Sequence, residues 1–363
     1  MNAPKKSSQE GDIKFPNPPQ DGISSLSVNG NEQSPTNMVI ATSWDNSVNC
    51  YELQYSPQQQ LSGIVPQAQT KHEGPVLCSD ISNDNVTVFT GGCDNAVRMW
   101  NVTQGAAGSQ VIGKHDAPIR NVKFIPEKNV VVTGSWDKTI KVWDMRQPTA
   151  AATLALSERV YCMDARSQIL VAATADKQMH VFDLTAGNKV SEFKSPLTYQ
   201  TKSLCIFHDC KGFAAGSIEG RVALEYFDEL QNKAMLANNP NAPKPATKNF
   251  AFKCHRDGAD IFAINSLHFH PYNTFASAGS DGVVTFWDKD ARQKLTSHDM
   301  LKKQCPITDV KFNMMGNLCF YSASYDWSRG AENNDPTKMV PNIYVHSVPS
   351  AEVAPKDPKS LKK

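Results

Sequence analysis

Three copies of a His, Asp and Trp set carry the residue types of a charge-relay site. The His precedes the Asp by 22 or 26 residues and the Trp follows it by six: His72, Asp94 and Trp100; His115, Asp137 and Trp143; His255, Asp281 and Trp287. A His held by a carboxylate can act as a general base, but no nucleophile accompanies these sets. Because one set recurs three times, we interpret it as structural. The His bridges a turn carboxylate and a strand hydroxyl, and the indole donates to the same network.

Other patterns that would indicate catalysis or metal binding are missing from the sequence. It has no Gly-rich phosphate loop, no H-E-x-x-H, no G-x-S-x-G and no C-x-x-C. Cys205, His208 and Cys210 lack a second ligand pair at a zinc-site spacing, so we interpret the thiols as core residues. His268 and His270 share one face of a strand and are interpreted as surface or loop-anchoring residues. The nine Cys are scattered, which indicates reduced thiols in an intracellular protein. We predict no enzyme activity, no cofactor and no metal.

The sets belong to a pattern that recurs along the chain. It consists of a small or Gly-Ser pair, an acidic residue in a tight turn, alternating apolar residues, and an aromatic or Trp-Asp ending, as in GSWDKTIKVWDM at 134–145. The seven turn acids are Asp45, Asp94, Asp137, Asp176, Glu219, Asp281 and Asp326. Their spacing is 39 to 49 residues except for one step of 62. A four-stranded propeller blade takes roughly 40 to 45 residues. The sequence thus predicts an all-β fold, a single seven-bladed WD40 β-propeller.

Three segments fall outside the regular repeat. Residues 228–250 are rich in Pro and Asn, and we predict a surface insertion there between blades five and six. The last blade lacks a fourth strand, so we predict that residues 11–16 pair with it as an N-terminal strand and close the ring. The expected domains are a disordered N-terminus at 1–10, the propeller at 11–348 and a basic disordered tail at 349–363.

The net charge of the chain is close to zero. Its 37 Lys and Arg residues balance 36 Asp and Glu residues, so no overall field attracts nucleic acid or an anionic membrane. No apolar stretch is long enough for a signal peptide or a membrane span. Any RNA contact must come from a local basic set. The candidates, around blade three, are Arg120, Lys123, Lys138, Lys141 and Arg146, although ordinary exposed strand positions explain them equally well.

Charged and aromatic residues also cluster around blades five and six, where the repeat does not require them. The candidate partner-binding residues are Arg221, Phe252, Lys253, Arg256, Trp287, Asp288, Lys289, Asp290 and Arg292. Aromatic and Arg side chains are enriched at protein interfaces, and the guanidinium group pairs well with carboxylates. We therefore predict a rim that binds a short peptide with acidic and apolar anchors. A solvated rim without a partner is the alternative.

Longer strings resemble one particular family. VTGSWDKTIKVWDMR at 132–146, GSIEGRVALEYF at 216–227, FAFKCHR at 250–256 and GSDGVVTFWDKDARQKL at 279–295 are similar to the nuclear-pore messenger-RNA export factors, a family of WD-repeat proteins. The resemblance extends over about residues 11–348. SIEGRVA and FKCHR also occur in a sister family, the spindle-checkpoint propeller that binds short motifs of mitotic kinases. WDKDAR and SYDWSRG resemble the export factors and not the sister family, which favours the former.

The resemblance implies a non-enzymatic docking protein. Members bind a hairpin-forming GLEBS segment of an FG-repeat nucleoporin, support export of poly(A) mRNA, and have mitotic spindle roles; viral proteins can occupy the same surface. The matching residues imply a partner contact through Arg221, Phe252, Trp287, Asp288, Lys289, Asp290 and Arg292. RNA is expected to bind directly or through the complex. The implied location is the nucleus and the nuclear envelope at the pore, with shuttling to the cytoplasm, and the implied state is a monomer within a heteromeric complex.

Overall fold

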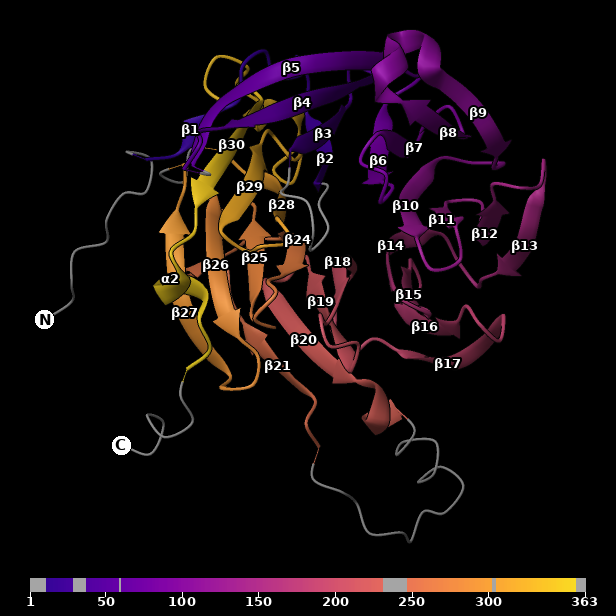
Figure 1. The fold of residues 1–363 in the computed structure, drawn as a ribbon. Helices are drawn as coiled ribbons and strands as arrows, with labels where there is room; N and C mark the ends of the chain where they lie inside the picture. The colour runs from indigo at the N-terminus through magenta and orange to yellow at the C-terminus, as the bar shows by residue number, and fades with distance from the viewer. Residues whose placement is uncertain (1–10, 29–36, 59, 231–246, 302–304, 357–363) are drawn as a thin grey trace, which may run out of the picture.

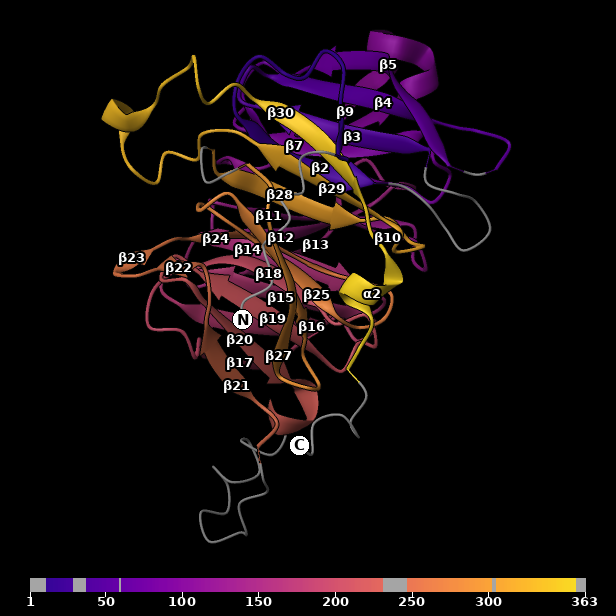
Figure 2. The same ribbon diagram turned by 90° about the vertical axis from the view of Figure 1, so that its left-hand side faces the viewer.

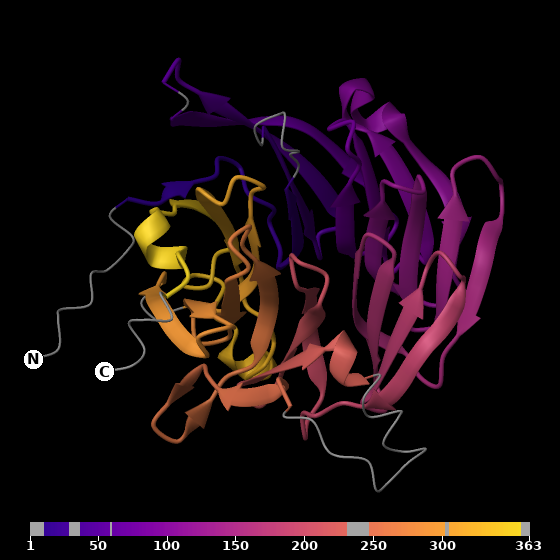
Figure 3. The same ribbon diagram turned by 60° about the horizontal axis from the view of Figure 1, so that its bottom comes forward.

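In the computed structural model, seven antiparallel four-stranded sheets are arranged around one axis (Figure 1 and Figure 3). The structure describes residues 11–28, 37–58, 60–230, 247–301 and 305–356. The predicted closed seven-bladed β-propeller is confirmed. Within the described residues, no helix is long and apolar enough to cross a membrane.

Six blades consist of four strands each, in chain order. Blade one contains β2 (Ile23–Val28), β3 (Met38–Ser43), β4 (Ser47–Tyr55) and β5 (Leu61–Lys71). Blade two contains β6 (Val76–Ile81), β7 (Thr87–Gly92), β8 (Ala96–Asn101) and β9 (Ser109–Lys114), with the 3-10 segment η2 (Val102–Gly108) before the last strand. Blade three contains β10 (Ile119–Ile125), β11 (Val130–Ser135), β12 (Thr139–Asp144) and β13 (Ala150–Ala155).

The next three blades repeat this order. Blade four contains β14 (Val160–Arg166), β15 (Ile169–Thr174), β16 (Gln178–Asp183) and β17 (Asn188–Lys194). Blade five contains β18 (Thr201–Ile206), β19 (Gly212–Ser217), β20 (Arg221–Tyr226) and β21 (Phe250–Lys253), and a small hairpin of β22 (Arg256–Asp257) and β23 (Asp260–Ile261) follows it. Blade six contains β24 (Ile264–Phe269), β25 (Phe275–Gly279), β26 (Val283–Asp288) and β27 (Gln293–Asp299).

Blade seven combines the two ends of the chain. Its strands are β28 (Ile307–Phe312), β29 (Leu318–Ala323) and β30 (Asn342–Ser347), with η3 (Ala331–Asn333) in the loop before β30, and its fourth strand is β1 (Ile13–Lys14). Ile13 pairs with Val345 and Lys14 with Tyr344. Phe15 is buried and makes edge contacts with Tyr51 of blade one and Phe320 of blade seven. The predicted closing strand is therefore present and lies within residues 11–16.

The strands follow from β-branched and apolar residues in short runs. β11, with the sequence VVVTGS, is buried along its whole length, whereas the outer strand β13 of the same blade is mostly exposed. A strand that is buried on both faces reads as a continuous apolar run, and an outer strand does not. The core thus lies between the blades, in clusters that each join two neighbouring sheets.

The residue after each turn acid has a positive φ. The angles lie between 60° and 73° at Asn46, Asn95, Lys138, Lys177, Gly220, Gly282 and Trp327. Asn and Gly adopt this left-handed conformation readily, whereas a bulky side chain does so at a cost. We call the end of the ring that carries these turns the turn-acid face, and the opposite end the far face. The loop at 324–341 and the β22–β23 hairpin project from the turn-acid face, on the left of Figure 2.

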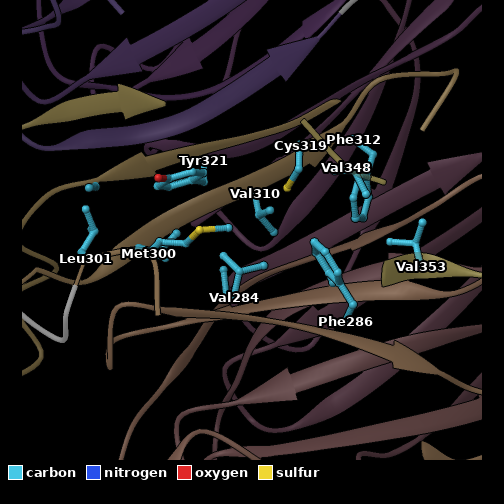
Figure 4. Packing of buried hydrophobic residues seen from close by; sticks show 14 of the residues in the cluster. Val284, Phe286, Met300, Leu301, Val310, Phe312, Cys319, Tyr321, Val348 and Val353 are labelled. Atoms are coloured by element: carbon cyan, nitrogen blue, oxygen red, sulfur yellow. The ribbon is translucent and has the colours of Figure 1, made fainter. Parts of the chain in front are cut away.

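The C-terminal segment packs onto blade six. The short helix α2 (Ser350–Val353) contacts β26 and β27, and Val353 is 2% exposed in a cluster with Phe286 and Val348 (Figure 4). The Lys356 amide donates to Asp288 Oδ2 at 2.8 Å. The prediction of a disordered tail at 349–363 was wrong for 350–356, because apolar burial and a carboxylate hold this segment. Residues 357–363 lie outside the described residues.

The other two predicted irregular segments are only partly described. The predicted N-terminus at 1–10 lies outside the described residues, as does most of the predicted insertion at 228–250, from 231 to 246. At the borders of the insertion, Glu229 and Leu230 are buried, and β21 begins at Phe250. The last residue of the predicted insertion is thus part of blade five.

Candidate protein-binding site

Two of the three His, Asp and Trp sets form one network each. His115 Nδ1 lies 2.7 Å from Asp137 Oδ2, and its Nε2 lies 2.7 Å from Thr133 Oγ1. The Trp143 indole donates to the same hydroxyl at 2.8 Å. The second network joins, at 2.7 to 3.0 Å, His255, Asp281, Ser277 and Trp287. The structure therefore brings both predicted sets together around a strand hydroxyl.

In the remaining set the Trp does not join the network. His72 Nδ1 lies 3.0 Å from Asp94 Oδ2 and its Nε2 lies 2.8 Å from Thr90 Oγ1. Trp100 Nε1, however, donates to the Gly105 carbonyl at 2.7 Å. The placement of Trp100 in the network was wrong, because η2 follows β8 in this blade alone among those described and supplies a different acceptor.

These His and Asp pairs stabilise turns. The side chains of His72 and His115 are 0% exposed, so a substrate cannot reach them. Burial lowers the pKa of His115, although the hydrogen bond and charge of Asp137 oppose this change. Burial works against ionisation of Asp94, but the hydrogen bond and charge of His72 and the Ala96 amide outweigh it and lower the pKa to about 2. The geometry fits an ionised carboxylate that holds a turn, and offers no exposed base.

Three of the nine candidate partner-binding residues lie at the turn-acid end of blade five. Arg221 and Lys253 are paired across β20 and β21. Arg221 Nε lies 3.8 Å from a carboxylate oxygen of Glu219, and Arg256 donates to the Glu219 carbonyl at 2.7 Å. Two arginine side chains thus contact Glu219, and together with Lys253 they leave an excess of positive charge at this end of the blade.

Four other candidates lie at the far face, in the turn between β26 and β27: Asp288, Lys289, Asp290 and Arg292. β26 begins two residues after the turn acid Asp281 and ends at Asp288. A strand of six residues separates its ends by roughly 17 Å. The structure therefore does not bring the nine residues into one rim, and the prediction of a single patch was wrong.

Phe252 and Trp287 lie between these two groups. Their ring centroids are 4.6 Å apart, and both side chains are half-buried between blades five and six. The Trp287 indole N–H is already bonded to Ser277. Both rings therefore contribute mainly to the packing between blades five and six, and little to a surface that a partner could contact.

Asp288 and Lys289 are buried, with exposures of 3% each. Asp288 Oδ1 accepts from the amides of Asp290 and Ala291 at 2.9 Å. Lys289 Nζ lies 2.7 Å from Asp290 Oδ1 and 5.1 Å from the ring centroid of Phe207. Both side chains have structural partners inside the chain, so they hold the turn that presents Asp290 and Arg292.

A groove with a volume of about 370 Å³ opens at this turn. Its lining consists of Asp209, Lys211, Tyr226, Asp228, Lys248, Lys289, Asp290 and Arg292. The Arg292 guanidinium lies 4.4 Å from the ring centroid of Phe250 and donates to the Lys248 carbonyl at 3.2 Å. Four cations, three carboxylates and two aromatic rings meet there.

The five residues predicted to contact RNA fall into two places. Arg120 and Lys123 line the central channel, a cavity of about 190 Å³ between the first strands of all seven blades, and Lys123 Nζ lies 3.1 Å from Asp164 Oδ1. The other three lie on the turns and the third strand of blade three. Lys138 is paired with Glu158, Lys141 donates to the Lys114 carbonyl, and Arg146 is paired with Asp144. The structure does not bring these five together.

Sequence reasoning missed the hollow at the mouth of the channel on the turn-acid face. It has a volume of about 860 Å³ and is lined by residues of blades three to seven, including Trp136, Ile218 and Ile261. A smaller hollow of about 170 Å³ beside it is lined by Trp44, Trp136 and Trp327. Trp44 and Trp327 are 44% and 53% exposed. Each of the three Trp residues is the immediate neighbour of a turn acid. This position could have indicated the surface, but the Trp residues were counted only as part of the repeat.

Comparison with known proteins adds to this geometry. Residues 65–101, 109–144 and 247–288 match the family model described as WD domain, G-beta repeat. The chain is 46% identical over 343 residues to Protein RAE1 of Arabidopsis thaliana, covering 93% of this chain and 91% of the relative. It is 42% identical over 342 residues to an mRNA export factor of Xenopus tropicalis, covering 90% and 87%. It is 38% identical over 355 residues to the mRNA export factor GLE2 of Chaetomium thermophilum, covering 95% and 92%.

The seven blades and the matches to WD repeats define the class of this protein as a WD-repeat β-propeller. Identities of 38 to 46% to these relatives, over at least nine-tenths of the chain, then show which family of WD-repeat proteins the chain belongs to. The chain belongs to the mRNA export factor family of WD-repeat proteins.

Proposed function

We propose that this protein is a non-enzymatic scaffold in messenger-RNA export that docks a GLEBS-type segment of an FG nucleoporin. The relatives are named mRNA export factors, and this supports the role in export. On this proposal the protein acts as a monomer within a heteromeric complex at the nuclear pore, in the nucleus and in transit to the cytoplasm. A mitotic spindle role is compatible with the same docking surface.

The observation that carries the docking proposal is the aromatic surface around the channel mouth. Trp44, Trp136 and Trp327 line one hollow there, and Ile218 and Ile261 are 42% and 51% exposed beside it. Large exposed apolar surface on a monomer marks a binding site, and Trp is the side chain most enriched among residues that dominate binding energy. We assign the apolar anchors of the nucleoporin segment to this surface.

Backbone strain supports the same assignment. Trp327 has a φ of 60° although it carries a bulky side chain. Its ring packs only against Tyr325 among the ring contacts of the described residues, at 5.4 Å between centroids. A strained, exposed aromatic residue costs stability, and such residues concentrate at binding sites.

The charges beside this surface suit an acidic partner. Arg256 is paired with the exposed Ile261 across the β22–β23 hairpin, and Arg221 lies 3.8 Å from Glu219, the residue after Ile218. Lys202 and Arg329 line the large hollow. Acidic residues of a bound hairpin would pair with these cations while its apolar residues contact the Trp rings. The predicted partner residues at the turn-acid end, Arg221, Lys253 and Arg256, thus remain part of the proposal.

The test is calorimetric binding of a synthetic GLEBS hairpin to the full-length protein. Replacing Trp44 and Trp327 with Ala should weaken binding at least 100-fold, because two central aromatic anchors contribute roughly 2 kcal/mol or more each. The melting temperature should change little, since both rings are about half exposed.

The matched control for that test is Arg292→Ala on the far face, which should bind the hairpin within about twofold of the unchanged protein. Tight binding by the double Trp variant with loss of binding in Arg292→Ala would instead place the nucleoporin on the far groove. Failure to bind any nucleoporin hairpin, with binding of mitotic-kinase motifs, would favour the spindle-checkpoint role.

We also propose that RNA contacts the far groove, in place of the five residues around blade three. Lys211, Lys248 and Arg292 are cations there, beside the rings of Tyr226 and Phe250. Single-stranded nucleic acid binds to surfaces that combine cations with aromatic rings on which bases stack. Lys123 lies in the central channel, a cavity of about 190 Å³, and is paired there with Asp164.

Fluorescence anisotropy with a labelled oligoadenylate tests this second proposal. Affinity should fall as salt rises, and Lys248→Glu with Arg292→Glu should both weaken binding and flatten that dependence by about one unit of slope per lost contact. Lys138→Glu, from the original set, is the control and should bind as the unchanged protein does. Equal loss in both variants would mean that RNA binds elsewhere.

A further inference from the structure

Two histidines and a glutamate from three separate elements meet beside the closing strand. His298 lies in β27 of blade six, His346 lies in β30 of blade seven, and Glu352 lies in α2. One ligand atom of each residue lies within 4.8 Å of the others, and within the described part of the chain this is the one group that could hold a metal ion. No spacing motif predicts this group, because His298 and His346 are more than 45 residues apart in the sequence.

The distances fit a shared ion. Glu352 Oε2 lies 3.0 Å from His298 Nε2 and 3.4 Å from His346 Nε2. Two ligands about 2.0 to 2.1 Å from a tetrahedral Zn²⁺ ion are roughly 3.3 Å apart, so one carboxylate oxygen and two imidazole nitrogens already stand close to this arrangement. The two imidazole rings are tilted by 50°, with centroids 4.9 Å apart.

His298 is paired with the same carboxylate. Its side chain is 9% exposed, and its fully buried Nε2 lies 3.0 Å from Glu352 Oε2. Two imidazole nitrogens from neighbouring blades therefore face one carboxylate oxygen in a site that is largely closed to solvent.

His346 is oriented as metal-bound histidines are. Its Nδ1 lies 2.6 Å from Asp12 Oδ1, which leaves Nε2 directed at Glu352. Asp12 is in turn fixed by the Tyr321 hydroxyl, which donates to Oδ2 at 2.7 Å. A carboxylate that accepts the Nδ1 proton of a histidine fixes the tautomer whose Nε2 lone pair binds a metal, and such outer partners normally accompany metal-ligating histidines.

We infer that His298, His346 and Glu352 bind a divalent transition-metal ion, best matched by Zn²⁺, with Asp12 as the outer carboxylate. Two imidazoles and one carboxylate form a common zinc ligand set with one position left for water, and imidazole selects Zn²⁺ and its neighbours over Mg²⁺ or Ca²⁺. The charges balance, since a 2+ ion meets the carboxylates of Glu352 and Asp12 beside two neutral imidazoles.

The bound ion would join both ends of the chain to the ring. Asp12 immediately precedes β1, Glu352 belongs to α2, and the two histidines belong to neighbouring blades. The ion therefore acts as a structural clamp at the point where the propeller closes. None of its three ligands is among the residues that line the hollows of the Trp surface or the groove at Arg292.

Cobalt titration of the full-length protein, freed of metal by chelation and dialysis, tests the inference. Co²⁺ should bind with one-to-one stoichiometry and give visible absorption of a site with nitrogen and oxygen ligands, without the near-ultraviolet sulfur band that binding to the cysteines would produce. Zn²⁺ should displace it, and the melting temperature should rise with Zn²⁺ concentration, as for any ligand of the folded state.

Variants separate this site from adventitious binding. His298→Gln and Glu352→Gln should each lose the one-to-one binding and the zinc-dependent rise in melting temperature, and Asp12→Asn should weaken binding about 10- to 100-fold. His208→Gln, a histidine outside the cluster, should titrate as the unchanged protein. Circular dichroism before titration confirms that each variant is folded. Absence of saturable binding, or binding that persists in both ligand variants, would overturn the inference.

Discussion

At the residue scale, the turn carboxylates act on the backbone as well as on the histidines. Asp137 Oδ1 accepts from the Thr139 amide at 2.9 Å, and Asp45 Oδ1 accepts from the Ser47 amide at 2.9 Å. The residue between the acid and the amide that it accepts from, Lys138 or Asn46, has the left-handed conformation in each turn. These roles could be predicted because each acid sits in a recurring string. The role of Trp100 could not, because its acceptor belongs to an irregular segment that the repeat does not describe.

Asp94 should make the protein less stable in acid. Its pKa is about 2 in the folded chain and 3.8 in the absence of these contacts. A carboxyl whose pKa is lowered by folding stabilises the folded state above the unfolded pKa, and this contribution is lost as pH falls from about 4 to 2. The difference corresponds to about 2 kcal/mol. Urea unfolding of the unchanged protein and of Asp94→Asn should therefore differ by about 2 kcal/mol at pH 6, and the gap should shrink below pH 4.

The control for acid unfolding is Glu127→Gln, whose side chain is exposed and which should unfold like the unchanged protein at every pH. A gap for Asp94→Asn that stays constant from pH 6 to pH 3 would contradict the assignment of the lowered pKa to this network.

At the scale of elements, the position of a predicted partner-binding residue depends on which end of its strand it occupies. The repeat pattern assigns Arg221 to blade five and Arg292 to blade six, which are neighbours. In the fold, Arg221 lies at the turn-acid end of β20, whereas Arg292 lies beyond the far end of β26. Charge placement along a sequence does not show this separation, because strand direction enters only with the fold. The order of α2 was likewise unpredictable from a four-residue segment, since it depends on burial of Val353 against distant strands.

The closing strand is the element whose loss should cost most. Deleting residues 1–16 removes β1 and Phe15, which is 1% exposed. Loss of a buried Phe side chain alone costs about 3 to 5 kcal/mol. We expect a melting temperature lower by several degrees and a broader transition in differential scanning calorimetry. Deleting residues 1–10 leaves β1 in place and should change neither quantity, and an unchanged melting curve for both deletions would refute the role of β1.

At the scale of the whole molecule, the number of blades and the manner of closure were predictable because they follow from a period that the sequence repeats seven times. The two proposed binding surfaces were not predictable, since each is assembled from residues of at least two blades whose positions the repeat pattern treats as equivalent. The Trp surface gathers side chains from blades one, three and seven. We therefore expect the binding function of this propeller to depend on residues that differ between repeats.

The pairing of β1 with β30 also constrains how the protein is made. Ile13 leaves the ribosome more than 300 residues before its partner Val345. Until β30 has been made, β1 lacks its partner strand, and Phe15 lacks its contact with Phe320 until β29 has been made. The ring can close only after β30 has been made, and contacts of such long sequence separation form slowly. The newly made protein therefore passes through a period in which the apolar faces of the first and sixth blades that pack against blade seven are available to chaperones or to other chains.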